Sequence, residues 1–277
     1  MHAATAGAET SFNILLARMV KNVEGAREVQ LMREALLENR ILEGLEIVRR
    51  AGIDVPKDVE AIADTVQVRM LHGGSRAFTP FDLSPDNILF ADRTQFLDYE
   101  WAGFRDVMFD VAGVIAGFPQ YITASPLSDE EVKVFVEAWS AEVGGAWPSV
   151  NNPDTLQARI TASLIGWVFF SVSILYADGD DTLSGTRYGK GGWTVDADAQ
   201  MGDDADLFDP QIREEDVERG AQILRSSARQ DFTPEEIAIR RDVAGTFDAL
   251  ARYAATGTEP AYAQISSFAA SVAERLA

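Results

Sequence analysis

The stretch that decides the fold, residues 78–90, reads FTPFDLSPDNILF, and the sequence FLDYE follows at residues 96–100. Two short apolar runs here, ILF and QFL, are separated by the polar tripeptide DRT. Apolar runs on either side of a polar turn are typical of an antiparallel β-hairpin. We therefore predict a hairpin over 88–97. Its open end brings Asn87 and Asp98 within the roughly 5 Å that separates cross-strand partners.

The polar residues around this hairpin are those that phosphoryl transfer requires. The amide and carboxylate oxygens of Asn87 and Asp98 form a partial shell suited to Mg²⁺, which keeps water ligands and adds the phosphates of ATP. Asp82 lies five residues before Asn87, across a loop containing Pro85, where it is placed to accept the proton of an incoming hydroxyl. The spacing Asp-Leu-x-x-x-Asn is typical of a kinase catalytic loop. Taken singly, each residue also fits a turn, a loop cap or an exposed strand end.

The order of these motifs resembles the aminoglycoside phosphotransferase and choline kinase family, in which Asp-Leu-x-Pro-x-Asn-Ile-Leu leads to Asp-x-Glu and then Asp-x-Ala. The resemblance implies that Asp82 is the catalytic base and that Asn87 and Asp98 are the magnesium ligands. It also implies that Glu100 and Asp110 support the site, Asp110 by hydrogen bonds that hold the catalytic loop. The implied activity is transfer of phosphate from ATP, with Mg²⁺, to a hydroxyl of a small molecule.

The fold that this resemblance implies is the large, C-terminal lobe of a protein-kinase-like fold, α+β and mainly α-helical. Two features depart from the family pattern. Pro80 stands two residues before the base, where the family usually has histidine. The residues before Asp82 predict large-lobe helices, so we expect the small, nucleotide-gripping lobe to be absent and the chain to be a truncated phosphotransferase. The alternatives are a non-catalytic kinase-like binding module and an atypical kinase of the quinone-biosynthesis type.

Apolar residues recur at helical spacing through most of the remaining chain. Before the motif, the expected helices cover 12–20, 25–51 and 56–71. Capping boxes beginning at Ser128 and Thr233 predict the start of two later helices. We expect residues 1–11 to form a flexible leader and 12–277 to form one lobe, in which the Gly- and Asp-rich segment 178–210 is a long acidic loop.

The composition limits the kinds of partner. The chain has 44 acidic and 24 basic residues and a formal net charge of −20, which opposes binding to nucleic acid or anionic membranes. The same charge favours a cationic small-molecule substrate. Absence of cysteine excludes disulfides and thiol nucleophiles. The N-terminus has no signal-peptide pattern, so we expect a cytoplasmic protein. The apolar stretch 160–177 is expected to be a buried core helix and not a membrane span.

Overall fold

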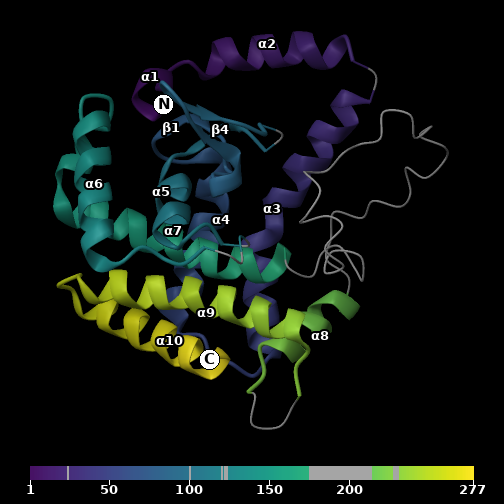
Figure 1. The fold of residues 1–277 in the computed structure, drawn as a ribbon, viewed down its shortest axis with the longest axis vertical. Helices are drawn as coiled ribbons and strands as arrows, with labels where there is room; N and C mark the ends of the chain where they lie inside the picture. The colour runs from purple at the N-terminus through teal and green to yellow at the C-terminus, as the bar shows by residue number, and fades with distance from the viewer. Residues whose placement is uncertain (24, 100, 120, 122–123, 175–213, 227–230) are drawn as a thin grey trace.

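The computed structural model describes the chain except residues 24, 100, 120, 122–123, 175–213 and 227–230. Helices dominate the described part, and the strands there form two small antiparallel sheets (Figure 1). The α+β, mainly α-helical class is thereby confirmed. The acidic loop predicted over 178–210 falls almost entirely outside the described residues.

Four helices begin the chain: α1 (His2–Thr5), α2 (Glu9–Lys21), α3 (Ala26–Arg50) and α4 (Lys57–His72). The last three correspond to the three helices that the periodicity predicts. The flexible leader predicted over 1–11 is not what the structure has, because α1 and the first turn of α2 occupy it and His2 is buried. The reason is tertiary, since His2 hydrogen-bonds residues far away in the sequence.

The strands form two separate antiparallel pairs. In one pair β1 (Arg76–Thr79) joins β4 (Gly103–Asp106), and in the other β2 (Ile88–Phe90) joins β3 (Thr94–Phe96). The β2–β3 hairpin confirms the sequence prediction. The β1–β4 pair was not predicted, because its strands are short and far apart in sequence. A single 3₁₀ turn, η1 (Pro85–Asn87), leads directly into β2.

After β4, every regular element of the described chain is a helix. This part of the chain contains α5 (Met108–Ile115), α6 (Asp129–Val143), the 3₁₀ turn η2 (Pro148–Asn151), α7 (Pro153–Ile174), α8 (Glu214–Ile223), α9 (Pro234–Ala255) and α10 (Pro260–Leu276). Both predicted capping boxes are present, at Ser128 and at Thr233, each with its two reciprocal hydrogen bonds. These boxes fix where α6 and α9 begin, because they satisfy backbone N–H groups that the first helical turn leaves free.

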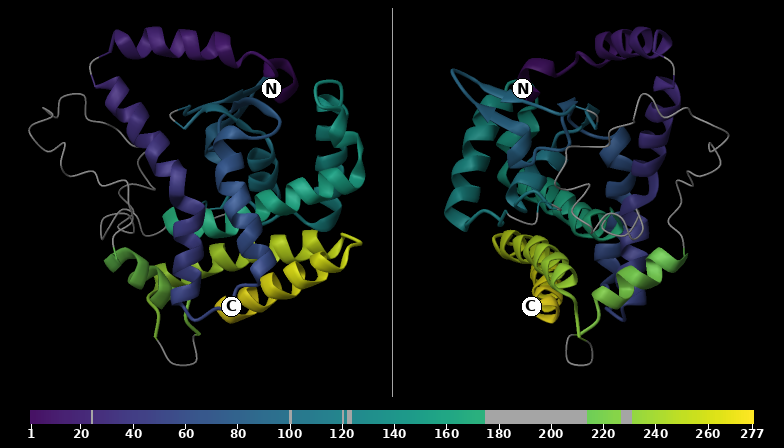
Figure 2. Two further views of the ribbon diagram at one scale, coloured as in Figure 1. Left: turned by 180° about the vertical axis from the view of Figure 1, so that it is seen from behind. Right: turned by 45° about the vertical axis from the view of Figure 1, so that its right-hand side comes forward.

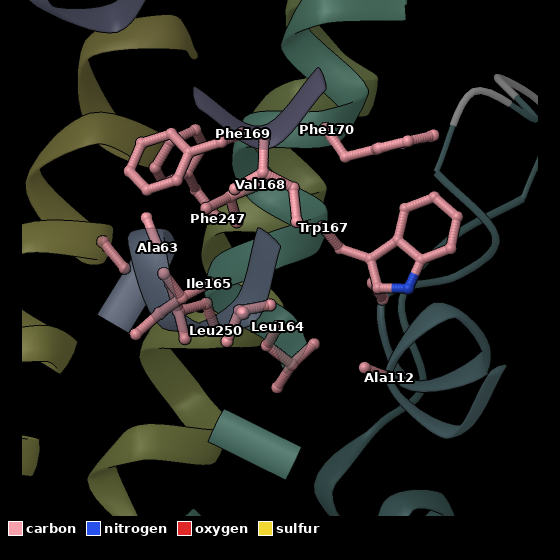
Figure 3. Packing of buried hydrophobic residues seen from close by; sticks show 14 of the residues in the cluster. Ala63, Ala112, Leu164, Ile165, Trp167, Val168, Phe169, Phe170, Phe247 and Leu250 are labelled. Atoms are coloured by element: carbon pink, nitrogen blue, oxygen red, sulfur yellow. The ribbon is translucent and has the colours of Figure 1, made fainter. Parts of the chain in front are cut away.

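Helix α7 is the centre of the core. It runs between the layer formed by α9 and α10 and the region of α5 and the strands (Figures 1 and 2). Its side chains pack against α9 through Phe247 and Leu250, against α4 through Ala63 and against α5 through Ala112 (Figure 3). Helix α3 crosses α7 so closely that a Cβ atom at Gly44 would lie 1.8 Å from the carbonyl oxygen of Phe169.

One helix in the described part of the chain, α7, is long and apolar enough to cross a membrane by length and composition alone. Within Pro153–Ser173, 78% of the apolar 18-residue stretch is buried inside the fold. This burial agrees with the core helix expected over 160–177, of which residues 175–177 lie outside the described part of the chain.

A buried charge cluster fixes the end of β4 against α4 and α7. The carboxylate of Asp106 is 1% exposed and accepts hydrogen bonds from Arg69 at 2.8 Å and from Arg159 at 2.9 Å. Arg159 also donates to Ser75, just before β1, and Asp106 accepts from the backbone N–H of Met108. The cluster therefore joins both strands of the β1–β4 pair to the helices beneath them.

Candidate functional site

The loop between β1 and β2 carries Asp82 and is organised around Ser84. The backbone N–H of Ser84 donates to Asp82 Oδ1 at 3.1 Å, which is the Asx turn that aspartate readily forms. The hydroxyl of Ser84 accepts from Asn87 Nδ2 at 3.2 Å. Ser84 is buried, whereas Asp82 and Asn87 are half-buried. Ser84 thus ties the predicted base to a predicted metal ligand, through its backbone N–H to Asp82 and through its hydroxyl to Asn87.

These hydrogen bonds leave one oxygen of each side chain available. In the described part of the chain, Asp82 Oδ2 and Asn87 Oδ1 have no hydrogen-bond partner. Because the amide nitrogen of Asn87 is held by Ser84, its oxygen is directed away from that serine. Asp82 therefore retains an acceptor for a proton, and Asn87 retains a hard oxygen donor for a cation.

The register of the β2–β3 hairpin places Asn87 opposite Leu97 and not opposite Asp98, so the predicted cross-strand pairing of Asn87 with Asp98 is shifted by one residue. The backbone N–H of Leu97 donates to the carbonyl of Asn87 at 2.8 Å, which extends the ladder by one residue and puts Asp98 one position further along. Asp98 is exposed and has a φ of 52°, a left-handed conformation that aspartate tolerates better than most residues. The chain therefore leaves the ladder at Asp98. Glu100 lies outside the described residues.

The donor set at this end of the hairpin suits one kind of metal. Among the residues that the structure describes, no group of three or more His, Asp or Glu side chains could hold a metal ion. Asn87 and Asp98 provide two oxygen donors only. By donor chemistry alone, two such side chains are of the kind that Mg²⁺ uses, because this ion usually binds proteins through one or two carboxylates and completes its shell with water and substrate phosphates.

Phe81, directly before Asp82, has a φ of 69°, which is unfavourable for a bulky side chain. Its ring is buried and stacks on Trp167 with centroids 5.5 Å apart, and it meets Phe170 edge-on at 5.4 Å. The guanidinium of Arg105 lies 5.2 Å from the ring centroid. These contacts from α7 and β4 hold the loop in a conformation that the local sequence disfavours.

Asp110 lies on α5 beneath this loop and is 2% exposed. Its Oδ2 is 3.0 Å from His2 Nε2, whereas its Oδ1 has no hydrogen-bond partner of good geometry. Burial raises the pKa of Asp110, while the hydrogen bond with His2, the charge of Arg105 and the backbone amide of Phe81 act in the opposite direction. The groups that act on the pKa of Asp110 thus include the backbone amide of Phe81, in the loop that carries Asp82.

Arg105 is a buried cation close to Asp110 and to the ring of Phe81. Burial lowers its pKa to about 10, although the nearby charges of Asp110 and Glu34 favour the protonated form. One of its guanidinium nitrogens donates to the backbone carbonyl of Trp101. Arg105 thus supplies positive charge close to Asp110 without an ion pair of its own among the described residues.

Sequence reasoning missed several members of this group. Ser84 could have been found, because a polar residue two positions after an aspartate is the pattern of an Asx turn. His2 gave no local signal, since its partners are distant in sequence, and nothing in the sequence marks Arg105 as a buried cation. Pro80 is buried at the end of β1 and carries no side-chain donor.

A separate cavity of about 410 Å³ lies between α6, α7 and α9. Its apolar lining includes Ile115, Val136 and Leu156, and Lys133 and Glu137 of α6 also line it. The loop residues 80–87 do not line this cavity. Its size lies within the range of small-molecule sites.

No protein-family model matches this chain, and no curated protein matches it.

Proposed function

We propose that this protein is an ATP- and Mg²⁺-dependent phosphotransferase that acts on a hydroxyl of a small molecule. The observation that carries the proposal is that Ser84 hydrogen-bonds both Asp82 and Asn87. This arrangement supports a base and a metal ligand on one rigid loop. The protein-kinase-like large lobe, the cytoplasmic location and a cationic acceptor belong to the same proposal and rest on the motif resemblance and the net charge of −20.

In this mechanism, Asp82 accepts the proton of the acceptor hydroxyl through the oxygen that Ser84 leaves free. Asn87 and Asp98 would hold Mg²⁺ through their side-chain oxygens. When bound, Mg²⁺ neutralises charge on the phosphates of ATP, which supplies the phosphoryl group. Asp110 and the packing of Phe81 keep the loop in shape. The contribution of the protein is therefore positioning and electrostatic stabilisation, which phosphoryl transfer chiefly requires.

The test is titration calorimetry with MgATP on the wild-type chain, Asp98→Ala and Asp92→Ala. Asp92 is an exposed aspartate in the turn of the same hairpin, so it is a matched control for charge and location. We expect binding to wild type and to Asp92→Ala, with a clear loss for Asp98→Ala. Absence of binding to wild type, or equal binding by Asp98→Ala, would reject the metal site.

A second candidate is a binding module without turnover, and the cavity between α6, α7 and α9 favours it. Its apolar lining and charged rim suit an amphipathic small molecule. A fluorescent apolar anion, anilinonaphthalene sulfonate, is a direct probe. Val136→Phe fills the cavity, whereas Val134→Phe, on the exposed face of the same helix, is the control. Probe binding that Val136→Phe alone abolishes, together with no MgATP binding, would select this candidate over the phosphotransferase.

A further inference from the structure

The first residues of the chain are attached to the elements around the Asp82 loop. Thr5 Oγ1 accepts a hydrogen bond from the backbone N–H of Phe78, on the edge of β1, at 3.1 Å. Glu9 forms a two-pronged ion pair with Arg76 of the same strand. His2 reaches furthest inward and is 8% exposed, between α5 and α6. The N-terminal segment therefore packs as part of the site region.

Both ring nitrogens of His2 are engaged, and their partners define the tautomer. The indole N–H of Trp139 on α6 points at His2 Nδ1, 3.1 Å away. Because an indole N–H only donates, Nδ1 must accept, and the ring proton lies on Nε2. His2 Nε2 therefore donates to Asp110 Oδ2 at 3.0 Å. These two hydrogen bonds select a single tautomer of the neutral ring, with its donor directed at a buried carboxylate.

Asp110 connects this histidine to the catalytic loop. The backbone amide of Phe81 and the charge of Arg105 both favour the ionised form of Asp110, and the Arg105 guanidinium lies 5.2 Å from the centroid of the Phe81 ring, so the surroundings of this carboxylate include the residue preceding Asp82. Phe81 has a left-handed φ of 69°, which needs support from outside the loop. Pro80 has no side-chain donor to orient Asp110. His2, which approaches from a different part of the chain, provides such a donor.

We propose that His2 is a positioning residue for the Asp82 loop and acts through Asp110. Its Nε2–H fixes the Asp110 carboxylate in the rotamer that faces the Phe81 backbone, and Trp139 fixes the tautomer that makes this donation. The importance of this positioning for turnover rests on the proposed function. The positioning itself does not, because it is a property of the folded chain without nucleotide.

Hydrogen exchange of the backbone amides of residues 81–84 tests the proposal, in wild type, His2→Leu and His2→Gln. Leucine removes the N–H donor but still fills the buried position with a side chain. The amide nitrogen of glutamine, in contrast, can donate in place of His2 Nε2–H. We expect exchange in His2→Leu to be about tenfold faster or more, the change expected when a hydrogen bond to a charged group is lost. Exchange in His2→Gln should stay near the wild-type rate.

Thr5→Val is the matched control for general loosening of the N-terminal segment. It removes the hydrogen bond from Phe78 and those that the Thr5 hydroxyl donates to the backbone carbonyls of Met1 and His2, and it keeps the His2 ring and Asp110. We expect it to leave exchange at 81–84 unchanged. The proposal is overturned if His2→Leu exchanges like wild type at these amides, or if Thr5→Val and His2→Gln accelerate them as much as His2→Leu does. Near-ultraviolet circular dichroism verifies that each variant is folded.

Failure of the proposed function gives a different result. If wild type binds no MgATP while His2→Leu still loosens residues 81–84, the phosphotransferase proposal falls and the positioning role stands. If wild type transfers phosphate, His2→Leu should lower kcat with little change in KM for ATP, and His2→Gln should restore kcat. Nitrogen NMR shows directly which ring nitrogen of His2 carries the proton. A proton on Nδ1 would contradict the assigned tautomer.

Discussion

Phe81 stacks on Trp167 with ring centroids 5.5 Å apart, although its backbone has a φ of 69°. A left-handed backbone costs an ordinary L-residue roughly 1–2 kcal/mol. The ring packing on α7 therefore compensates for local strain at the position before Asp82. Two opposing contributions act at one residue, and suitable substitutions can separate them.

Replacing Phe81 separates packing from strain. Phe81→Ala should destabilise the fold by about 3–5 kcal/mol, because it removes a buried ring and leaves a cavity. Phe81→Gly should be more stable than Phe81→Ala by about 1 kcal/mol, since glycine adopts positive φ without a Cβ clash. Urea unfolding of both variants measures the difference. Equal stabilities, or the usual advantage of alanine over glycine, would contradict the left-handed conformation.

The crossing of α3 and α7 makes Gly44 intolerant of any side chain. A Cβ atom there would overlap the carbonyl oxygen of Phe169 at 1.8 Å. Gly44→Ala should therefore destabilise the protein by more than about 2 kcal/mol, even though alanine is the better helix former. Gly145→Ala is the control, because nothing lies within 4 Å of its added Cβ. A thermal midpoint for Gly44→Ala close to that of Gly145→Ala would be inconsistent with the close crossing.

Asp106 neutralises two arginines at the base of the β1–β4 pair. Asp106→Asn keeps the shape but leaves Arg159 buried without its carboxylate, so we expect a loss of about 3 kcal/mol, at the lower end of the range for broken buried pairs. Asp92→Asn, in an exposed turn, should change stability by less than about 0.5 kcal/mol. Urea unfolding provides the comparison. Stability of Asp106→Asn near that of the control would exclude a structural role for the cluster.

The Glu9–Arg76 pair makes attachment of the N-terminal segment depend on pH. The hydrogen bond from Arg76, aided by its charge, lowers the pKa of Glu9 against a smaller effect of burial. The stabilisation is therefore complete above the ordinary glutamate pKa and is lost as the pH falls through the lowered value. Because the pair is partly exposed, Glu9→Gln should cost less than about 1 kcal/mol at neutral pH.

This cost should disappear under strongly acidic conditions, where Glu9 is protonated in both the folded and the unfolded chain. Denaturant unfolding of wild type and Glu9→Gln across the acidic range tests the sign. A difference that grows as the pH falls would mean that the pair does not lower the pKa of Glu9.

Asp82→Asn separates catalysis from folding in the proposed function. Asparagine can still accept the hydrogen bond from Ser84, so the loop and MgATP binding should be retained. Transfer to the same acceptor alcohol should fall at least about 100-fold, as expected when a general base is lost. Asp86→Asn, an exposed aspartate in the same loop, should keep the rate. Unchanged transfer by Asp82→Asn would assign the base to another residue.

Local features of the sequence predicted local features of the structure. The hairpin over 88–97 and the helices beginning after Ser128 and Thr233 are present because their signals and their hydrogen bonds lie within a few residues of one another. The spacing of Asp82 and Asn87 likewise brings both to a single serine within the loop. In each case the sequence by itself determined the feature, since little chain has to be ordered between the interacting groups.

The tertiary structure alone decided what surrounds that loop. The β1–β4 pair and the ring of His2 against Asp110, 108 residues away, are long-range contacts without a local sequence signal. The left-handed backbone of Phe81 is likewise disfavoured locally and maintained by Trp167 of α7. These contacts form only when the helices pack, because burial around α7 supplies the free energy that orders them. The sequence thus determined the residues of the candidate site, whereas packing determined what holds them in place.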